Sequence, residues 1–212
     1  MKTIQITNLP SPDDLVLSYI KDYVTDGEFE NFYRNKVSNE VYGGNINMVL
    51  SNQIGLHPLF ELIQKQYQPY FVAPIIRSYF DFLTNVEPDK GPATLPPHIH
   101  TIRTLALNYF IDLGGENVKT CFYTHKPKTG MQVFEPQEKW GGYLSLEDVS
   151  PYGHIVTEKS KWHVYNTRIP HSVEGVTGTR IFLSLVFDAT HEMADLLLEE
   201  KLEYNVIPII KD

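Results

Sequence analysis

The sequence has 212 residues, a formal net charge of −8 and no run of lysines and arginines, which argues against nucleic acid as a partner. This length is enough for one well-buried core, and we expect residues 1–212 to form a single domain. The 13 tyrosines and 11 phenylalanines favour half-buried pleated surfaces, and therefore β structure.

Membrane insertion and disulfide bonding are both disfavoured. No stretch approaches the roughly 18–20 consecutive apolar residues that cross a bilayer. Residues 1–10 contain one lysine and no apolar segment, unlike a secretory signal. The single cysteine, Cys121, excludes an internal disulfide framework and is interpreted as a small core residue. We therefore expect a cytoplasmic protein with no membrane partner.

Two helices are predicted within residues 1–69, which we expect to form a mostly helical flank. The run Ser-Pro-Asp-Asp at 11–14 is typical of a helix start, because a capping hydroxyl, an early proline and carboxylates near the positive end of the dipole all stabilise it. This helix should end near Gly27. A second helix is expected over 58–67, where leucine and isoleucine recur on one face. Residues 28–52 show no clear pattern.

From residue 70 onward, aromatic and branched residues dominate and the pattern becomes that of strands. Residues 86–97 contain four prolines and one glycine and are predicted to be a loop. The stretch 126–160 is rich in turn residues, and a helix is expected over 188–201. Strands are expected at 71–83, 102–113, 118–124, 162–167, 180–187 and, at a sheet edge, 204–210.

This order of elements predicts a mainly β fold. Helices followed by many short strands are typical of a double-stranded β-helix, the cupin-like jelly roll, with helices packed outside it. We expect the jelly-roll core to span 70–187, with the helical flank before it and a C-terminal helix and strand over 188–212.

Three histidines and an arginine carry the candidate chemistry. His98 and His100 are two residues apart, so on a strand both imidazoles point to one face and could reach one metal ion. His171, in a Pro-His-Ser-Val run, could close the site from a neighbouring strand, and imidazoles suit Fe, Zn, Cu or Ni. Arg180 and Ser184 share one face of the following strand. A guanidinium beside a hydroxyl is suited to binding a carboxylate.

The segments PHIHTIRTLALNYFIDLGGENVKTCFYT (97–124) and WHVYNTRIPHSVEGVTGTRIFLSLVF (162–187) resemble the small bacterial and phage-type members of the 2-oxoglutarate/Fe(II) oxygenase superfamily. The resemblance covers roughly residues 70–190. It implies an oxidoreductase of the dioxygenase type that uses Fe(II), 2-oxoglutarate and O2 on a small-molecule or peptide substrate.

Carried over by position, the resemblance makes His98 and His171 metal ligands, with Arg180 binding the distal carboxylate of 2-oxoglutarate and Ser184 assisting. It also makes three other residues candidate contacts for co-substrate or substrate, with barrel lining and core as the alternative: Asn108, Tyr109 and Tyr123. His163 alternates with Trp162 on a strand, and a core and a surface position are equally compatible with it.

One departure from the family pattern concerns the metal ligands. His100 stands where the family has a carboxylate, so the predicted catalytic and metal-binding set is three histidines. A ferrous ion with a dianionic co-substrate is neutral in such a site and anionic in the usual one. A carboxylate from Asp112 or Glu116 could also complete the site. The alternatives are a three-histidine cupin-like metalloprotein that uses no keto acid, and a non-catalytic jelly-roll binding module.

Overall fold

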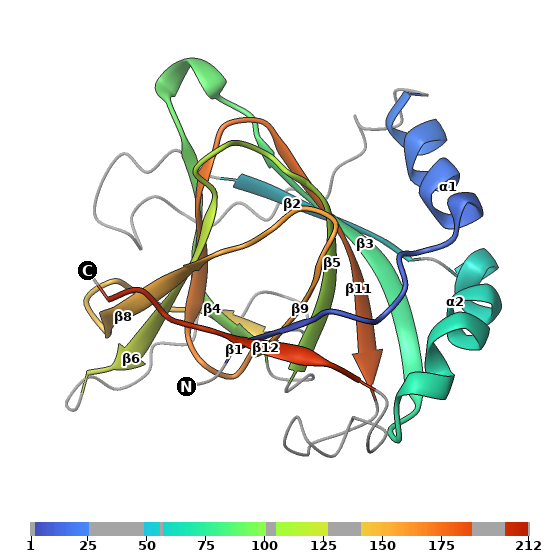
Figure 1. Cartoon of the computed structure of the whole chain (residues 1–212). Coiled ribbons are helices and arrows are strands. Elements are labelled where there is room, and N and C mark those ends of the chain that lie inside the picture. Colours follow the sequence, from blue (N-terminus) through green and yellow to red (C-terminus); the bar gives the residue numbers. More distant parts are fainter. Residues whose placement is uncertain are drawn as a thin grey trace.

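A computed structural model of the protein describes residues 3–25, 49–55, 57–100, 105–126, 141–187 and 202–211. The described strands form two antiparallel sheets (Figure 1). The larger sheet has the order β12-β1-β9-β5-β11-β3-β2, and the smaller has the order β7-β4-β10-β6-β8. Consecutive strands alternate between the sheets in several places, which is the jelly-roll arrangement. The predicted fold class is therefore confirmed.

The bounds of the elements are as follows. The large sheet contains β1 (Thr3–Ile6), β2 (Val49–Gly55), β3 (Ile75–Asn85), β5 (Leu105–Leu113), β9 (Trp162–Asn166), β11 (Thr179–Phe187) and β12 (Tyr204–Ile207). The small sheet contains β4 (Ala93–His100), β6 (Lys119–His125), β7 (Gly141–Tyr143), β8 (Val149–Val156) and β10 (His171–Val176). The helices are α1 (Asp14–Thr25), α2 (Phe60–Tyr67) and the 3-10 turns His57–Leu59, Gln68–Tyr70 and Pro88–Lys90.

The two helices lie on the side of the large sheet that faces away from β6 and β8 (Figure 1). Both were predicted, although α1 begins after Asp13, whose carbonyl accepts the first backbone hydrogen bonds, rather than at Ser11. Val16 and Ile20 in α1 are buried four residues apart, and so are Ile63 and Tyr67 in α2. Each helix therefore presents one apolar stripe to the sheet.

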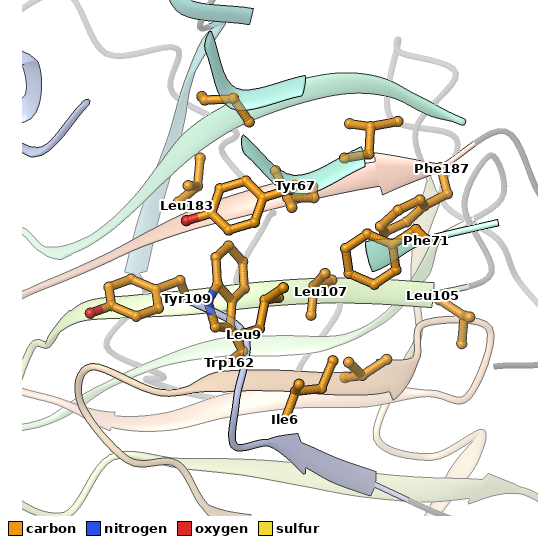
Figure 2. Packing of buried hydrophobic residues seen from close by; sticks show 14 of the residues in the cluster. Ile6, Leu9, Tyr67, Phe71, Leu105, Leu107, Tyr109, Trp162, Leu183 and Phe187 are labelled. Carbon is orange, nitrogen blue, oxygen red and sulfur yellow. The ribbon is translucent and has the colours of Figure 1, made fainter. Parts of the chain in front are cut away.

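The main apolar core lies between these helices and the large sheet (Figure 2). The Trp162 ring meets Tyr67 edge-on with centroids 5.0 Å apart and lies 5.1 Å from Tyr109. The Trp162 Nε1–H donates to the carbonyl of Pro10 over 2.9 Å, so its polar edge is satisfied. Leu105, Leu107 and Tyr109 alternate along β5 and all face this core.

A second set of buried residues fills the space between the two sheets. Phe110 and Phe182 from the large sheet pack with Leu95 and Val173 from the small sheet. Ala106 and Tyr165 pack with residues of β6 and β8 in the same interior. Residues 106, 108 and 110 of β5 thus face the interior, and residues 105, 107 and 109 face the helices.

Residues 93–97 are not part of a loop, so the loop predicted over 86–97 is wrong in its last five residues. They begin β4, whose pairing with β10 shifts between His171–His98 and Val173–Leu95. Pro96 and Pro97 therefore stand opposite the single residue Ser172. Proline has no backbone N–H, and an irregular pairing of this kind is where a strand tolerates it.

Other differences concern short or interrupted strands. The turn-rich stretch 126–160 contains β7 and β8, and β1 and β2 extend the large sheet into the region predicted as a helical flank. β12 lies at the edge of the large sheet, as predicted. The helix predicted over 188–201 lies outside the described residues. Neither described helix has the length and apolar run that a bilayer crossing requires.

Candidate metal centre

Three imidazoles meet where the end of β4 lies beside the start of β10. His98 and His171 are cross-strand partners, and His100 lies two residues further along β4, on the same face. One nitrogen from each ring lies within 4.8 Å of the nitrogens of the other two. The ring centroids of His98 and His171 are 4.3 Å apart. The group could therefore hold one metal ion.

Backbone carbonyls orient two of the three rings. Nδ1 of His98 lies 2.8 Å from the carbonyl oxygen of Pro96, and Nδ1 of His171 lies 2.8 Å from that of Ile169. A carbonyl can only accept, so each Nδ1 carries the hydrogen, and each Nε2 keeps its lone pair for a metal. Hydrogen bonds of this kind fix the tautomer of metal-binding histidines.

Burial favours the neutral form of His98 and His100. It lowers the pKa of His98 to about 4 and holds that of His100 well below its usual value. Neutral imidazole is the form that binds transition metals. The donor set therefore suits a transition metal at neutral pH, and it contributes no negative charge.

Neither carboxylate that the sequence offered as a fourth ligand lies at the histidines. Asp112 is near the end of β5, where it accepts a hydrogen bond from the N–H of Gly114 in the following turn and pairs with Lys159 at 3.4 Å. Glu116 is exposed in the same turn. Among the described residues, the metal-type group consists of histidines alone.

Arg180 is 1% exposed and faces the interior between the sheets. Its guanidinium carbon lies 4.4 Å from the centroid of the Phe110 ring and 6.0 Å from that of Phe182. Its Nε and Nη1 are buried and have no hydrogen-bond partner among the residues that the structure describes. Burial lowers the pKa of Arg180 to about 10, with Asp81 among the charges that oppose the shift, so it remains a cation at neutral pH.

A row of polar side chains crosses the interior face of the large sheet. Ser184 on β11 pairs with Asn108 on β5, and Asn108 pairs with His163 on β9. Asn108 donates to the Tyr165 hydroxyl over 3.1 Å, while its Oδ1 is buried without a partner in the described part of the chain. The Tyr165 ring lies 5.5 Å from that of His171. Tyr165 thus connects this row to the three histidines.

Two predicted co-substrate contacts are on the wrong faces. Tyr109 faces the helices, where its hydroxyl donates to Ser11 over 3.2 Å. Tyr123 lies on the outer face of the small sheet, and its hydroxyl contacts Ser172 at 3.0 Å and donates to Glu174 over 2.9 Å. Ser172 follows His171 in β10, so the two side chains point to opposite faces. Tyr109 and Tyr123 therefore fit the core alternative, whereas Asn108 and Ser184 face the interior.

Sequence reasoning did not single out Tyr165. The available signal was the alternation in β9: Trp162 and Val164 face the helices, so residues 163 and 165 must face the interior. His163 was considered without being assigned to either face.

No protein-family model and no curated protein matches this sequence. Among solved structures, it is similar to a Bacillus subtilis oxalate decarboxylase with Mn(II) centres, at 10% identity and a TM-score of 0.32 over 77% of this chain. The chain covers only 35% of that protein. It is also similar to an RmlC-like cupin protein from Desulfovibrio desulfuricans, at 15% identity and a TM-score of 0.25, over 56% of this chain and 84% of that one. Both scores are too low to inform on the metal or the chemistry of this chain.

Proposed function

We propose that this protein is an Fe(II)- and 2-oxoglutarate-dependent oxygenase with a three-histidine metal centre. The observation that carries the proposal is Arg180, a fully buried cation in the interior that the three histidines face, with two nitrogens that have no partner among the described residues. The sequence resemblance at 97–124 and 162–187 supports the same conclusion.

Energetics favour an anionic ligand beside Arg180. A buried N–H without an acceptor costs about 1–3 kcal/mol, and a buried charge without a partner costs more. The Phe110 ring offsets part of this cost through its contact with the guanidinium. A ligand carboxylate would supply both the missing acceptors and the opposite charge.

Each residue has a distinct task in this proposal. His98, His100 and His171 would hold the iron through the nitrogens that face one another, with two of the rings oriented by backbone carbonyls. Arg180 would bind the distal carboxylate of 2-oxoglutarate, and Asn108 and Ser184 would flank the ligand. Bound iron would supply the redox chemistry that couples decarboxylation of 2-oxoglutarate to oxidation of the substrate by O2.

The interior also limits the access of water. Phe110 and Phe182 are buried and pack together beside Arg180. Phe122 and Tyr165 pack together near His171. Excluding water strengthens the attraction between the guanidinium and a carboxylate. We propose a small-molecule or peptide substrate that enters on the histidine side.

A second candidate function is favoured by His100. Three neutral imidazoles leave the metal with its full positive charge, and a cupin-like metalloprotein with such a site needs no keto acid. Arg180 separates the two candidates, because only the oxygenase requires a buried cation to hold a co-substrate.

The test is calorimetry of 2-oxoglutarate binding to the metal-loaded protein and to Arg180→Ala. We expect the variant to bind at least about tenfold more weakly, which corresponds to about 1.4 kcal/mol. Succinate should compete with 2-oxoglutarate, and pyruvate should compete poorly. Arg168→Ala is the matched control, because Arg168 is exposed in the turn before β10. Equal affinities, or no binding by the wild type at millimolar concentration, would leave the cupin-like alternative.

The ligand substitution gives a second, independent test. In His100→Asp the usual carboxylate is restored, and we expect iron-dependent decarboxylation of 2-oxoglutarate to be kept or increased. Its abolition, with iron still bound, would show that this site depends on three imidazoles. His171→Ala should lose most of the affinity for iron in either background.

A further inference from the structure

His163 is a buried histidine outside the candidate metal centre. It is 1% exposed and lies on the interior face of β9, opposite Asn108. Its ring packs against Phe110 with centroids 5.3 Å apart. The guanidinium carbon of Arg180 lies 4.4 Å from the centroid of the same Phe110 ring. His163 and Arg180 therefore both contact Phe110 in the interior between the two sheets.

The hydrogen bonds of His163 fix its tautomer. The backbone N–H of Glu158 donates to Nε2 over 3.2 Å, so Nε2 carries no hydrogen. Burial lowers the pKa of His163 to about 4, and the ring is neutral at pH 7. The one ring hydrogen is then on Nδ1. Nδ1 is buried and has no hydrogen-bond partner among the described residues, so the ring presents an unused N–H donor.

One kind of ligand could accept hydrogen bonds from the unused donors of both Arg180 and His163. Water could accept from the imidazole, but it would not neutralise the guanidinium. An anionic acceptor satisfies both requirements, and the charge of Arg180 already acts on His163, since it contributes to the low pKa of the imidazole. A carboxylate has two oxygens, which can accept from two different donors.

We propose that His163 is a specificity-determining residue whose Nδ1–H donates to the same distal carboxylate that Arg180 binds. The proposal rests on the 2-oxoglutarate function proposed above and adds an uncharged second donor to it. The charged donor attracts the anion, and the neutral donor fixes the orientation of the carboxylate at the end of the ligand remote from the metal.

The experiment compares 2-oxoglutarate with 2-oxovalerate, a keto acid of the same chain length without the distal carboxylate. Both are titrated by calorimetry into the metal-loaded full chain. In His163→Phe, which has no ring N–H, we expect the affinity for 2-oxoglutarate to fall about tenfold, since a hydrogen bond to a charged group contributes about that much. The affinity for 2-oxovalerate should stay within about twofold.

Two amide variants separate the roles of the two ring nitrogens. The asparagine amide reaches the position of Nδ1, and the glutamine amide reaches that of Nε2. His163→Asn should therefore keep most of the affinity for 2-oxoglutarate, and His163→Gln should lose it as the phenylalanine variant does. The matched control is His154→Phe, because His154 pairs with Cys121 on the outer face of the small sheet. It should leave both affinities unchanged.

The outcomes distinguish this inference from the proposed function. If 2-oxoglutarate binding depends on Arg180 but is equally tight in His163→Phe and His163→Gln, only the role of His163 is overturned. An equal loss for both keto acids shows a structural role and also overturns it. If the wild type binds no 2-oxoglutarate, the proposed function fails. In that case succinate is titrated into the wild type and the His163 variants instead. If succinate binding does not depend on His163, the inference is overturned as well.

Discussion

Residues of β5 point alternately toward the helices and toward the interior between the sheets, and the two faces differ in chemistry. On the helix side, aromatic and aliphatic side chains pack closely and Trp162 Nε1 is hydrogen-bonded to protein, although Ser78 Oγ on the same side has no partner in the described part of the chain (Figure 2). On the interior side, Arg180, His163 and Asn108 each have a buried polar atom with no partner in the described part of the chain. We interpret the first face as the stabilising core and the second as the face of the ligand site proposed above.

The largest effect on folding should come from the helix-side face. Trp162→Ala removes a fully buried ring that contacts Tyr67 and Tyr109. We expect the free energy of unfolding to fall by about 3–5 kcal/mol, measured by urea denaturation. The exposed residue Tyr204, on the edge strand β12, is the control, and Tyr204→Ala should change stability by no more than about 0.5 kcal/mol. A small loss for Trp162→Ala would contradict the assignment of this face as the stabilising core.

The second effect is a pH dependence that originates on the interior face. The pKa of His163 is about 4 in the folded protein and about 6.5 in the unfolded chain. Between these values the unfolded chain binds more protons, so stability present at pH 7 is lost as pH falls below about 6.5, by up to about 3 kcal/mol near pH 4. Urea denaturation across this range should show a shallower pH dependence for His163→Phe than for the wild type. Identical slopes would mean that His163 is not held neutral by burial.

Arg180→Met should separate stability from ligand binding. A buried charge without a hydrogen-bonded ion-pair partner carries a desolvation penalty, which an apolar side chain of similar length removes. We expect the ligand-free variant to unfold within about 1 kcal/mol of the wild type or later, while its 2-oxoglutarate affinity falls at least about tenfold. A loss of stability comparable to that of Trp162→Ala would show that Arg180 is a structural cation, and the difference between the two faces would disappear.

The smallest effect compares two adjacent residues of β5. Tyr109→Phe removes the hydrogen bond to Ser11 and should cost about 1 kcal/mol of stability, with no change in 2-oxoglutarate affinity. Asn108→Ala should weaken 2-oxoglutarate binding, because this amide faces the interior. Calorimetry on both variants checks the assignment of faces, and a binding defect in Tyr109→Phe would reverse it.

Local patterns were enough to predict much of the fold. The helix-start residues at 11–14 and the apolar stripe of α2 predicted both helices, and the branched and aromatic runs predicted β3, β5, β6, β9 and β11. β4 was missed over 93–97 because its prolines are compatible with a strand only where its pairing with β10 shifts. That shift depends on a strand more than 70 residues away, which no local window contains.

The candidate site, like the fold, was predicted in part from local patterns and depends in part on distant strands. The spacing of His98 and His100 put both rings on one face, and the Pro-His-Ser-Val run pointed to His171, but only strand pairing between β4 and β10 brings the three nitrogens within 4.8 Å of one another. Tyr109 and Tyr123 looked as suitable as Asn108, since residue type does not say which face of a sheet is the interior.

The sequence by itself determined both helices, the strands β3, β5, β6, β9 and β11 and the residues able to bind a metal or a carboxylate, because these follow from side-chain chemistry and from periodicity along the chain. Tertiary structure decided which face of each strand is enclosed by the second sheet and which is covered by helices. Burial by distant segments removed water from Arg180 and His163, and this desolvation leaves the donors that the proposed ligand would satisfy.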